Sequence, residues 1–353
     1  MSGRRHPSRL AAIALSVAAS AGAIVAALAR IGPSRVEHSL SGVRPGWMLA
    51  AFALMATSMA ARALSWQAVL RAAAPSVHVG AAVVGRATMI GVMTSALAPG
   101  RLGEPARALV VARHTGNVRR ALPVVLGTLV SQTVLNLLAL GALFVVSYAS
   151  ISALHPGGGL IGVLVVPLAV ALAVAAAPAL LRLARRARSE RVRAAAAWAR
   201  RQAQALRSGM RVFAEPRQAV PAAAAQLAAW GLQLLACYAV LRALGLGSRA
   251  GLDAAAAVLL AVNVSAAVPV TPGNVGVFQG ACLVVLAAYG VGAGPALAYG
   301  IILQALEVGT AVALGVPALA AEGVGWHELV RAQPPATSRR RKTSAAATSD
   351  GTA

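Results

Sequence analysis

Three ionisable residues interrupt an otherwise apolar part of the chain in the stretch APGRLGEPARAL, residues 98–109: Arg101, Glu104 and Arg107. A charged side chain at membrane depth is costly, so it is a candidate functional residue whose partner should be named. Glu104 and Arg107 are three residues apart and therefore share one helical face. The spacing predicts a carboxylate–guanidinium pair, which fits either a binding site or an ion pair that only holds a hairpin together.

A second stretch, PVTPGNVGVFQG (269–280), repeats the backbone pattern of the first. The shared spacing is Pro-Gly-x-x-Gly, at Pro99, Gly100 and Gly103 and again at Pro272, Gly273 and Gly276. Proline removes a backbone donor and breaks a helix, and glycine permits a tight turn. The free amides and helix N-termini after such breaks can bind an anion. Interrupted apolar segments at corresponding positions in two halves indicate a transporter's substrate site, although a plain loop or a chance match also fits.

Three more polar residues are candidates for the same site. Asn274 and Gln279 lie in the second Pro-Gly stretch, and Glu307 lies in LQALEVGTAVALG. Asn274 and Gln279 supply neutral hydrogen-bonding groups. Glu307 is an acid at membrane depth and is expected to face the substrate, unless it marks the interfacial end of a helix.

Four polar residues in other apolar segments are given structural roles. Gln132 and Asn136 are four residues apart and point the same way, which favours contact between helices over a binding site. Arg62 and Arg86 are expected to extend their guanidinium groups to the lipid headgroups.

The composition identifies an all-α polytopic membrane protein. Of the 353 residues 58% are hydrophobic and 12% are charged, whereas a soluble domain is about half apolar and a quarter charged. The long Ala/Leu-rich runs lack the alternation of a membrane β-barrel, so the spans should be helices. We expect two Pro-Gly-broken helical hairpins at 80–112 and 254–291, which could form an inverted repeat. About six full spans are expected at 10–29, 46–70, 121–149, 159–181, 218–241 and 295–320.

The positive charge predicts the topology. The net charge is +23, but the basic residues occur in short runs between apolar segments, which argues against nucleic-acid binding. Most of the 32 Lys and Arg fall in segments that one orientation places in the cytoplasm. Both termini are therefore expected to be cytoplasmic in a multi-pass protein of the plasma membrane. The count does not decide whether the hairpins cross the bilayer or turn back within it.

One transmembrane domain, 10–320, should form the body of the protein, between a cytoplasmic N-terminus at 1–9 and a basic tail at 321–353. The tail is expected to be cytoplasmic and largely disordered. Within the domain, 182–217 predicts a basic cytoplasmic helix. It could bind the anionic inner leaflet or serve only to fix the topology.

At these motifs the chain resembles the lysylphosphatidylglycerol synthase transmembrane region, a flippase-like membrane family. Its pattern Pro-x-Arg-x-Gly-Glu-x-x-Arg is matched from Pro99 through Arg107, and the resemblance covers most of 10–320. Members fused to a cytosolic aminoacyl transferase are implied to move a modified lipid between leaflets, and this chain resembles a stand-alone member. It departs from the pattern where the family often has charges, at Ser131, Gln132, Asn136 and Gln279.

The resemblance and the charges together suggest a lipid translocator. Its substrate would be an anionic phospholipid or a polyprenyl-phosphate-linked envelope precursor. Arg101 and Arg107 would hold the phosphate, and Glu104 would orient Arg107. The two halves would rock around this site.

Two alternatives stay open. A non-transporting partner would scaffold envelope-biosynthesis enzymes through the basic helix. A lipid-linked transferase is disfavoured, because few acids lie near the membrane and the sequence has no metal motif. We therefore expect no enzymatic activity, no cofactor and no metal, with anionic lipid headgroups as partners. The oligomeric state is left open.

Overall fold

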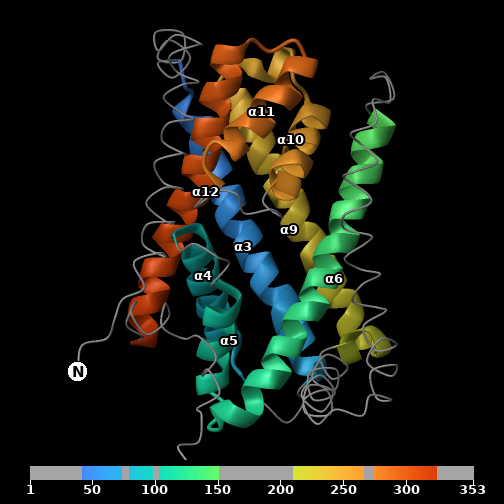
Figure 1. Ribbon diagram of the computed structural model, residues 1–353, viewed down its shortest axis with the longest axis vertical. Helices are drawn as coiled ribbons and strands as arrows, with labels where there is room; N and C mark the ends of the chain where they lie inside the picture. The colour runs from blue at the N-terminus through green and yellow to red at the C-terminus, as the bar shows by residue number, and fades with distance from the viewer. Residues whose placement is uncertain (1–41, 74–78, 98–102, 151–209, 266–273, 324–353) are drawn as a thin grey trace, which may run out of the picture.

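Four long apolar helices form the frame of the protein (Figure 1). The computed structural model describes residues 42–73, 79–97, 103–150, 210–265 and 274–323, and these contain helices and short connections but no strand. The described part thus confirms the all-α polytopic class, and the predicted spans 10–29 and 159–181 lie outside it. The four helices long and apolar enough to cross a membrane are α3 (Pro45–Ala73), α6 (Val118–Ser150), α9 (Pro216–Ala243) and α12 (Ala293–Glu322).

Two hairpins of shorter helices lie between these spans: α4 (Ala81–Leu97) with α5 (Gly103–Arg113), and α10 (Leu252–Ser265) with α11 (Val277–Ala288). At ~1.5 Å per residue their arms are about 16 to 26 Å long, less than the ~30 Å hydrocarbon core. In Figure 1 one hairpin occupies the lower half of the long axis and the other the upper half. Each returns to the end at which it began, so the hairpins enter from opposite ends and turn back.

A close contact between two glycines sets the geometry of the first hairpin. Gly103 is the first residue of α5 and is buried against the carbonyl oxygen of Gly91 in α4. A Cβ added to Gly103 would overlap that oxygen and the Ser95 hydroxyl. Its φ is not in the left-handed region, so this glycine allows close packing rather than a turn. Gly276 differs, because it precedes α11 at φ 88°, where other residues are strained.

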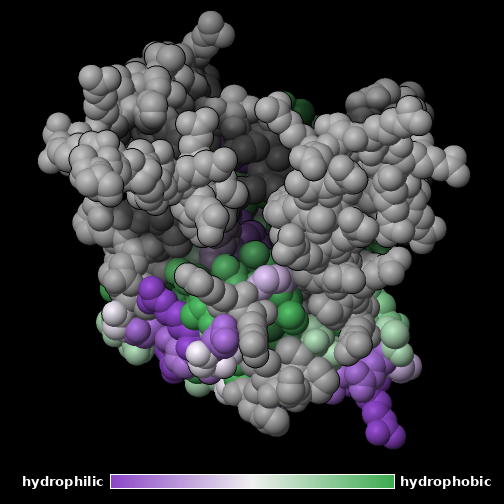
Figure 2. All heavy atoms as spheres, turned by 60° about the horizontal axis from the view of Figure 1, so that its bottom comes forward, coloured by the Kyte–Doolittle hydropathy of each residue, from purple (hydrophilic) through white to green (hydrophobic). Residues whose placement is uncertain are grey.

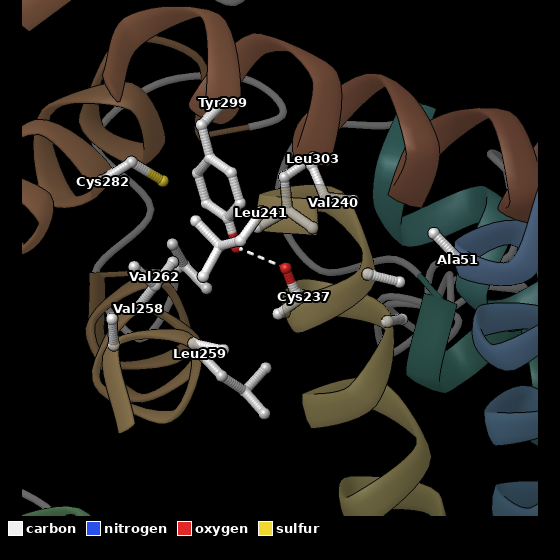
Figure 3. Close-up of a cluster of buried hydrophobic side chains, with 14 of the residues drawn as sticks. Ala51, Cys237, Val240, Leu241, Val258, Leu259, Val262, Cys282, Tyr299 and Leu303 are labelled. Carbon is white, nitrogen blue, oxygen red and sulfur yellow. Dashed lines mark hydrogen bonds between the residues drawn. The ribbon is translucent and has the colours of Figure 1, made fainter. Parts of the chain in front are cut away.

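Two apolar cores are built around the two hairpins. One combines α9 to α12 with the first half of α3. Figure 3 shows Tyr299 of α12 reaching into this core, where its hydroxyl donates a hydrogen bond of 3.1 Å to the Cys237 carbonyl oxygen. The other core combines α4 and α5 with Trp66 and the rest of α3. Helix α12 joins both, since it contacts α11 at Gly300 and α4 at Gly315.

The predicted basic helix 182–217 is wrong at its C-terminal end. Residues Met210–Ala214 form a short 3-10 helix, and α9 begins separately at Pro216. Proline is favoured in the first turn of a helix, where no amide partner is lost, so it starts a new helix here. The rest of that segment, the 1–9 terminus and nearly all of the 321–353 tail lie outside the described residues.

We predict that Gly103→Ala destabilises the protein by about 1 to 3 kcal/mol, as overpacking does elsewhere, because the hairpin must open to admit the methyl group. Thermal unfolding in detergent measures the effect. Gly231→Ala in α9 is the matched control, since nothing lies within 4 Å of its Cβ position. Equal melting temperatures for the two variants would contradict the close-packing role of Gly103.

Candidate functional site

Arg107 is held between an acid and an aromatic ring at the inner end of the first hairpin. Its Nε donates a hydrogen bond of 3.1 Å to Oε2 of Glu104, and its Nη2 donates to the same oxygen. On its other side the guanidinium lies 4.9 Å from the centroid of the Trp66 ring in α3. The Trp66 indole donates in turn to the Thr128 hydroxyl at 3.0 Å. The pair predicted from the sequence is therefore present, and a cation–π contact fixes the guanidinium against α3.

The two members of this pair differ in exposure. The Arg107 side chain is 11% exposed and the Glu104 side chain 52%. Glu104 lies in the first turn of α5, where a negative charge also interacts favourably with the helix dipole. The pair thus presents a half-exposed carboxylate over a nearly buried guanidinium.

The polar residues of the second hairpin are engaged in hydrogen bonds of their own. The Gln279 side-chain oxygen accepts from the Gly276 amide at 2.7 Å, and its Nε2 donates to Gln304 of α12. Asn274 adopts a left-handed φ of 57° and donates to the Ser265 hydroxyl at 3.1 Å. Asn274 and Gln279 therefore shape the turn before α11, in the half of the molecule opposite α5 (Figure 1). The remaining candidates, Arg101, Pro99, Gly100, Pro272 and Gly273, lie outside the described residues.

Glu307 has a partner that sequence reasoning missed. Its carboxylate interacts electrostatically with the Arg62 guanidinium of α3 and forms a hydrogen bond with the Gln233 side chain of α9. Arg62 donates from Nη2 to the Gln233 oxygen, and its guanidinium lies 5.7 Å from the Trp230 ring centroid. The expectation that Arg62 reaches the lipid headgroups is wrong, because these partners hold it between α3 and α9. The sequence signal that could have indicated a protein partner is the position of Arg62 deep within an apolar segment.

Arg86 also has a protein partner. Its Nε donates to Oε1 of Glu322 at 2.6 Å, and the other carboxylate oxygen of Glu322 lies 3.4 Å from Nε2 of His114. Glu322 is buried at the end of α12, so its charge requires such partners. This cluster ties α12 to both arms of the first hairpin.

Gln132 and Asn136 of α6 make the contacts between helices that their spacing favours. Asn136 accepts hydrogen bonds from Gln226 and from the Trp230 indole, the latter at 3.3 Å. Gln132 donates to the Arg62 carbonyl oxygen at 3.5 Å, the long limit of a hydrogen bond. These bonds join α6 to α9 and α3.

Comparison with known proteins identifies the family. The sequence profile of the lysylphosphatidylglycerol synthase TM region matches residues 12–315. The chain belongs to this family. No curated protein and no solved structure matches it. Membership of this family agrees with the four apolar spans and shows that the chain is an integral membrane protein of the lysylphosphatidylglycerol synthase type.

Within the described ranges, no group of three or more His, Cys, Asp or Glu side chains could hold a metal ion. The two cysteines, Cys237 and Cys282, are buried free thiols. The ionisable side chains that carry the candidate site are thus Glu104 and Arg107, with Arg62 and Glu307 beyond them.

We predict that Glu104→Cys reacts with a small, water-soluble thiol reagent, whereas Ala108→Cys does not. A half-exposed carboxylate at this depth is stable only if it faces water, and Ala108 is completely buried. Mass spectrometry of the labelled protein measures the reaction, and the wild type supplies the background from its buried cysteines. An unreactive thiol at position 104 would mean that the pair faces lipid or protein instead.

Proposed function

We propose that this protein moves an anionic amphiphile between the leaflets of the membrane without enzymatic chemistry. The substrate is a phospholipid or a polyprenyl-phosphate-linked envelope precursor. The observation that carries the proposal is the Glu104–Arg107 pair at the inner end of a re-entrant hairpin. A guanidinium in a fixed orientation can bind a phosphate through two parallel hydrogen bonds.

Membership of a flippase-like family supports this proposal, and so does the arrangement of the two hairpins. They enter from opposite ends, as transporters built from inverted repeats do, with broken helices near the substrate site. The Glu104 carboxylate competes with the substrate phosphate for Arg107. It therefore keeps the guanidinium paired when no lipid is bound, and its exposure lets an incoming headgroup replace it.

We further propose that the end bearing the loop after α5 faces the cytoplasm, in the plasma membrane. Figure 2 shows hydrophilic side chains gathered in patches at this end, with hydrophobic side chains between them. Arg71, Arg113 and Arg217 are exposed here. Basic residues at cytoplasmic loops follow the positive-inside rule, and by the same rule we propose that both termini are cytoplasmic.

We predict that Arg107→Ala and Glu104→Gln slow lipid exchange between leaflets at least tenfold. Alanine removes the group that binds the phosphate, and glutamine no longer orients it as a carboxylate does. The purified protein is reconstituted into liposomes with fluorescent phosphatidylglycerol or with a fluorescent polyprenyl-phosphate analogue. Exchange is measured as the fraction of probe that a membrane-impermeant quencher reaches with time.

Arg249→Ala serves as the control, because it removes an exposed arginine far from the pair and should leave the rate unchanged. Exchange of one probe and not the other would identify the substrate class. No exchange of either lipid by a protein with a cooperative unfolding transition would contradict transport. That result would favour the alternative, a scaffold for envelope-biosynthesis enzymes.

A further inference from the structure

The two halves of the described chain have the same order of elements. A long helix, two short helices and a second long helix occur as α3 to α6 and again as α9 to α12. The corresponding long helices have 29 and 28 residues, and 33 and 30 residues. Because the two short pairs enter from opposite ends, the halves are related by inversion (Figure 1).

Four polar residues occupy equivalent positions in these halves. Arg62 follows the first residue of α3 by 17 positions, and Gln233 follows the first residue of α9 by the same number. Gln132 in α6 and Glu307 in α12 each follow the first residue of their helix by 14 positions. Arg62 therefore corresponds to Gln233, and Gln132 corresponds to Glu307. We call these four residues the axial quartet.

The axial quartet forms a contact across the interface between the halves. The Arg62 guanidinium donates to the Gln233 side chain, which joins the two equivalent residues directly. Gln132 contacts Arg62 within the first half, and Glu307 contacts Gln233 within the second. The quartet therefore lies where the pseudo-symmetry axis passes, and transporters bind their substrates at such repeat interfaces.

Two atoms of the quartet are buried without a hydrogen-bond partner. They are Nε of Arg62, a donor, and the side-chain oxygen of Gln132, an acceptor. Gln132 is only 3% exposed. Leaving such groups unpaired is costly, and native structures rarely do so without a functional reason. The open donor belongs to a guanidinium, which suits an oxyanion.

A second guanidinium, that of Arg107, lies near Arg62 on the same side of α3. Trp66 follows Arg62 by four residues, so both lie on one face of α3. Arg107 packs on the Trp66 ring, close enough for its charge to act on Arg62. Two guanidinium groups therefore follow one face of the same helix, the outer one beside the half-exposed Glu104 and the inner one on the axis.

We propose that Arg62 is an inner phosphate-binding site and that Glu307 is the counter-ion of its empty state. This inference rests on the proposed function and extends it by a second binding position for the lipid phosphate. A guanidinium at the centre of a membrane span needs a negative charge nearby, and Glu307 supplies it through Gln233 when no lipid is bound. A phosphate that reaches Arg62 brings its own negative charge and replaces Glu307. On release the carboxylate resumes its place, which helps the lipid to leave.

Two substitutions on the axis should then change lipid affinity in opposite directions. Glu307→Gln removes the competing charge, so it should raise the affinity for fluorescent phosphatidylglycerol about tenfold and slow leaflet exchange, because release is hindered. Arg62→Gln should lower the affinity at least tenfold. Binding is measured by fluorescence anisotropy on the purified protein in neutral detergent, and exchange is measured in liposomes.

The controls separate a local effect from general electrostatics and from misfolding. Glu215→Gln removes an exposed acid at the start of α9, away from the axis, and should not raise the affinity. Arg62→Gln leaves Glu307 unpaired and could fail to fold, so the double variant with Glu307→Gln, which buries neither charge, is measured beside it. We expect the double variant to fold and to bind as weakly as Arg62→Gln.

Unchanged or lower affinity in a folded Glu307→Gln variant would overturn the inner site. If Arg107→Ala still abolished exchange in that case, the proposed function would stand without the inner site. If Glu307→Gln bound lipid more tightly but the wild type exchanged no lipid, the inner site would stand and transport would fail.

Discussion

A positive charge inside a membrane-spanning helix has to be compensated within the protein, and Arg62 meets this requirement through residues of two other helices. Gln233 of α9 accepts its hydrogen bond, the Trp230 ring lies beside it, and Glu307 of α12 supplies the opposite charge. This constraint joins α3, α9 and α12 at the centre of the bundle. The apolar cores on either side of this contact each pack around one hairpin.

The two hairpins differ in the side chains that they bring toward this centre. Because Gly103 lacks a side chain, α5 can approach α4 closely, and this position brings Arg107 onto Trp66 of α3. In the opposite hairpin the corresponding stretch carries no charge, and Gln279 caps its own helix and bonds to Gln304. The halves therefore share an architecture but differ in chemistry. Charge is present beside the turn of the first hairpin, while the turn of the second contributes neutral hydrogen bonds.

Several neutral polar side chains in the apolar segments have definite partners in the structure. Asn136 accepts hydrogen bonds from α9, and Gln279 secures the start of α11 against α12. These amides hold helices together without the cost of a buried charge. The ionisable groups that remain near the axis, Arg62 and Glu307, come from separate spans, so their pairing depends on how the halves meet.

The sequence by itself determined the helical class, the four described spans to within a few residues and the Glu104–Arg107 pair. Apolar length and three-residue spacing are local properties, and folding does not change them. Only the tertiary structure decided that the hairpins turn back and that Arg62 pairs inward with Gln233 and Glu307. Those partners are far from Arg62 in the chain. Nothing in local spacing indicates which faces of α3, α9 and α12 will meet, because helix packing between the halves selects them.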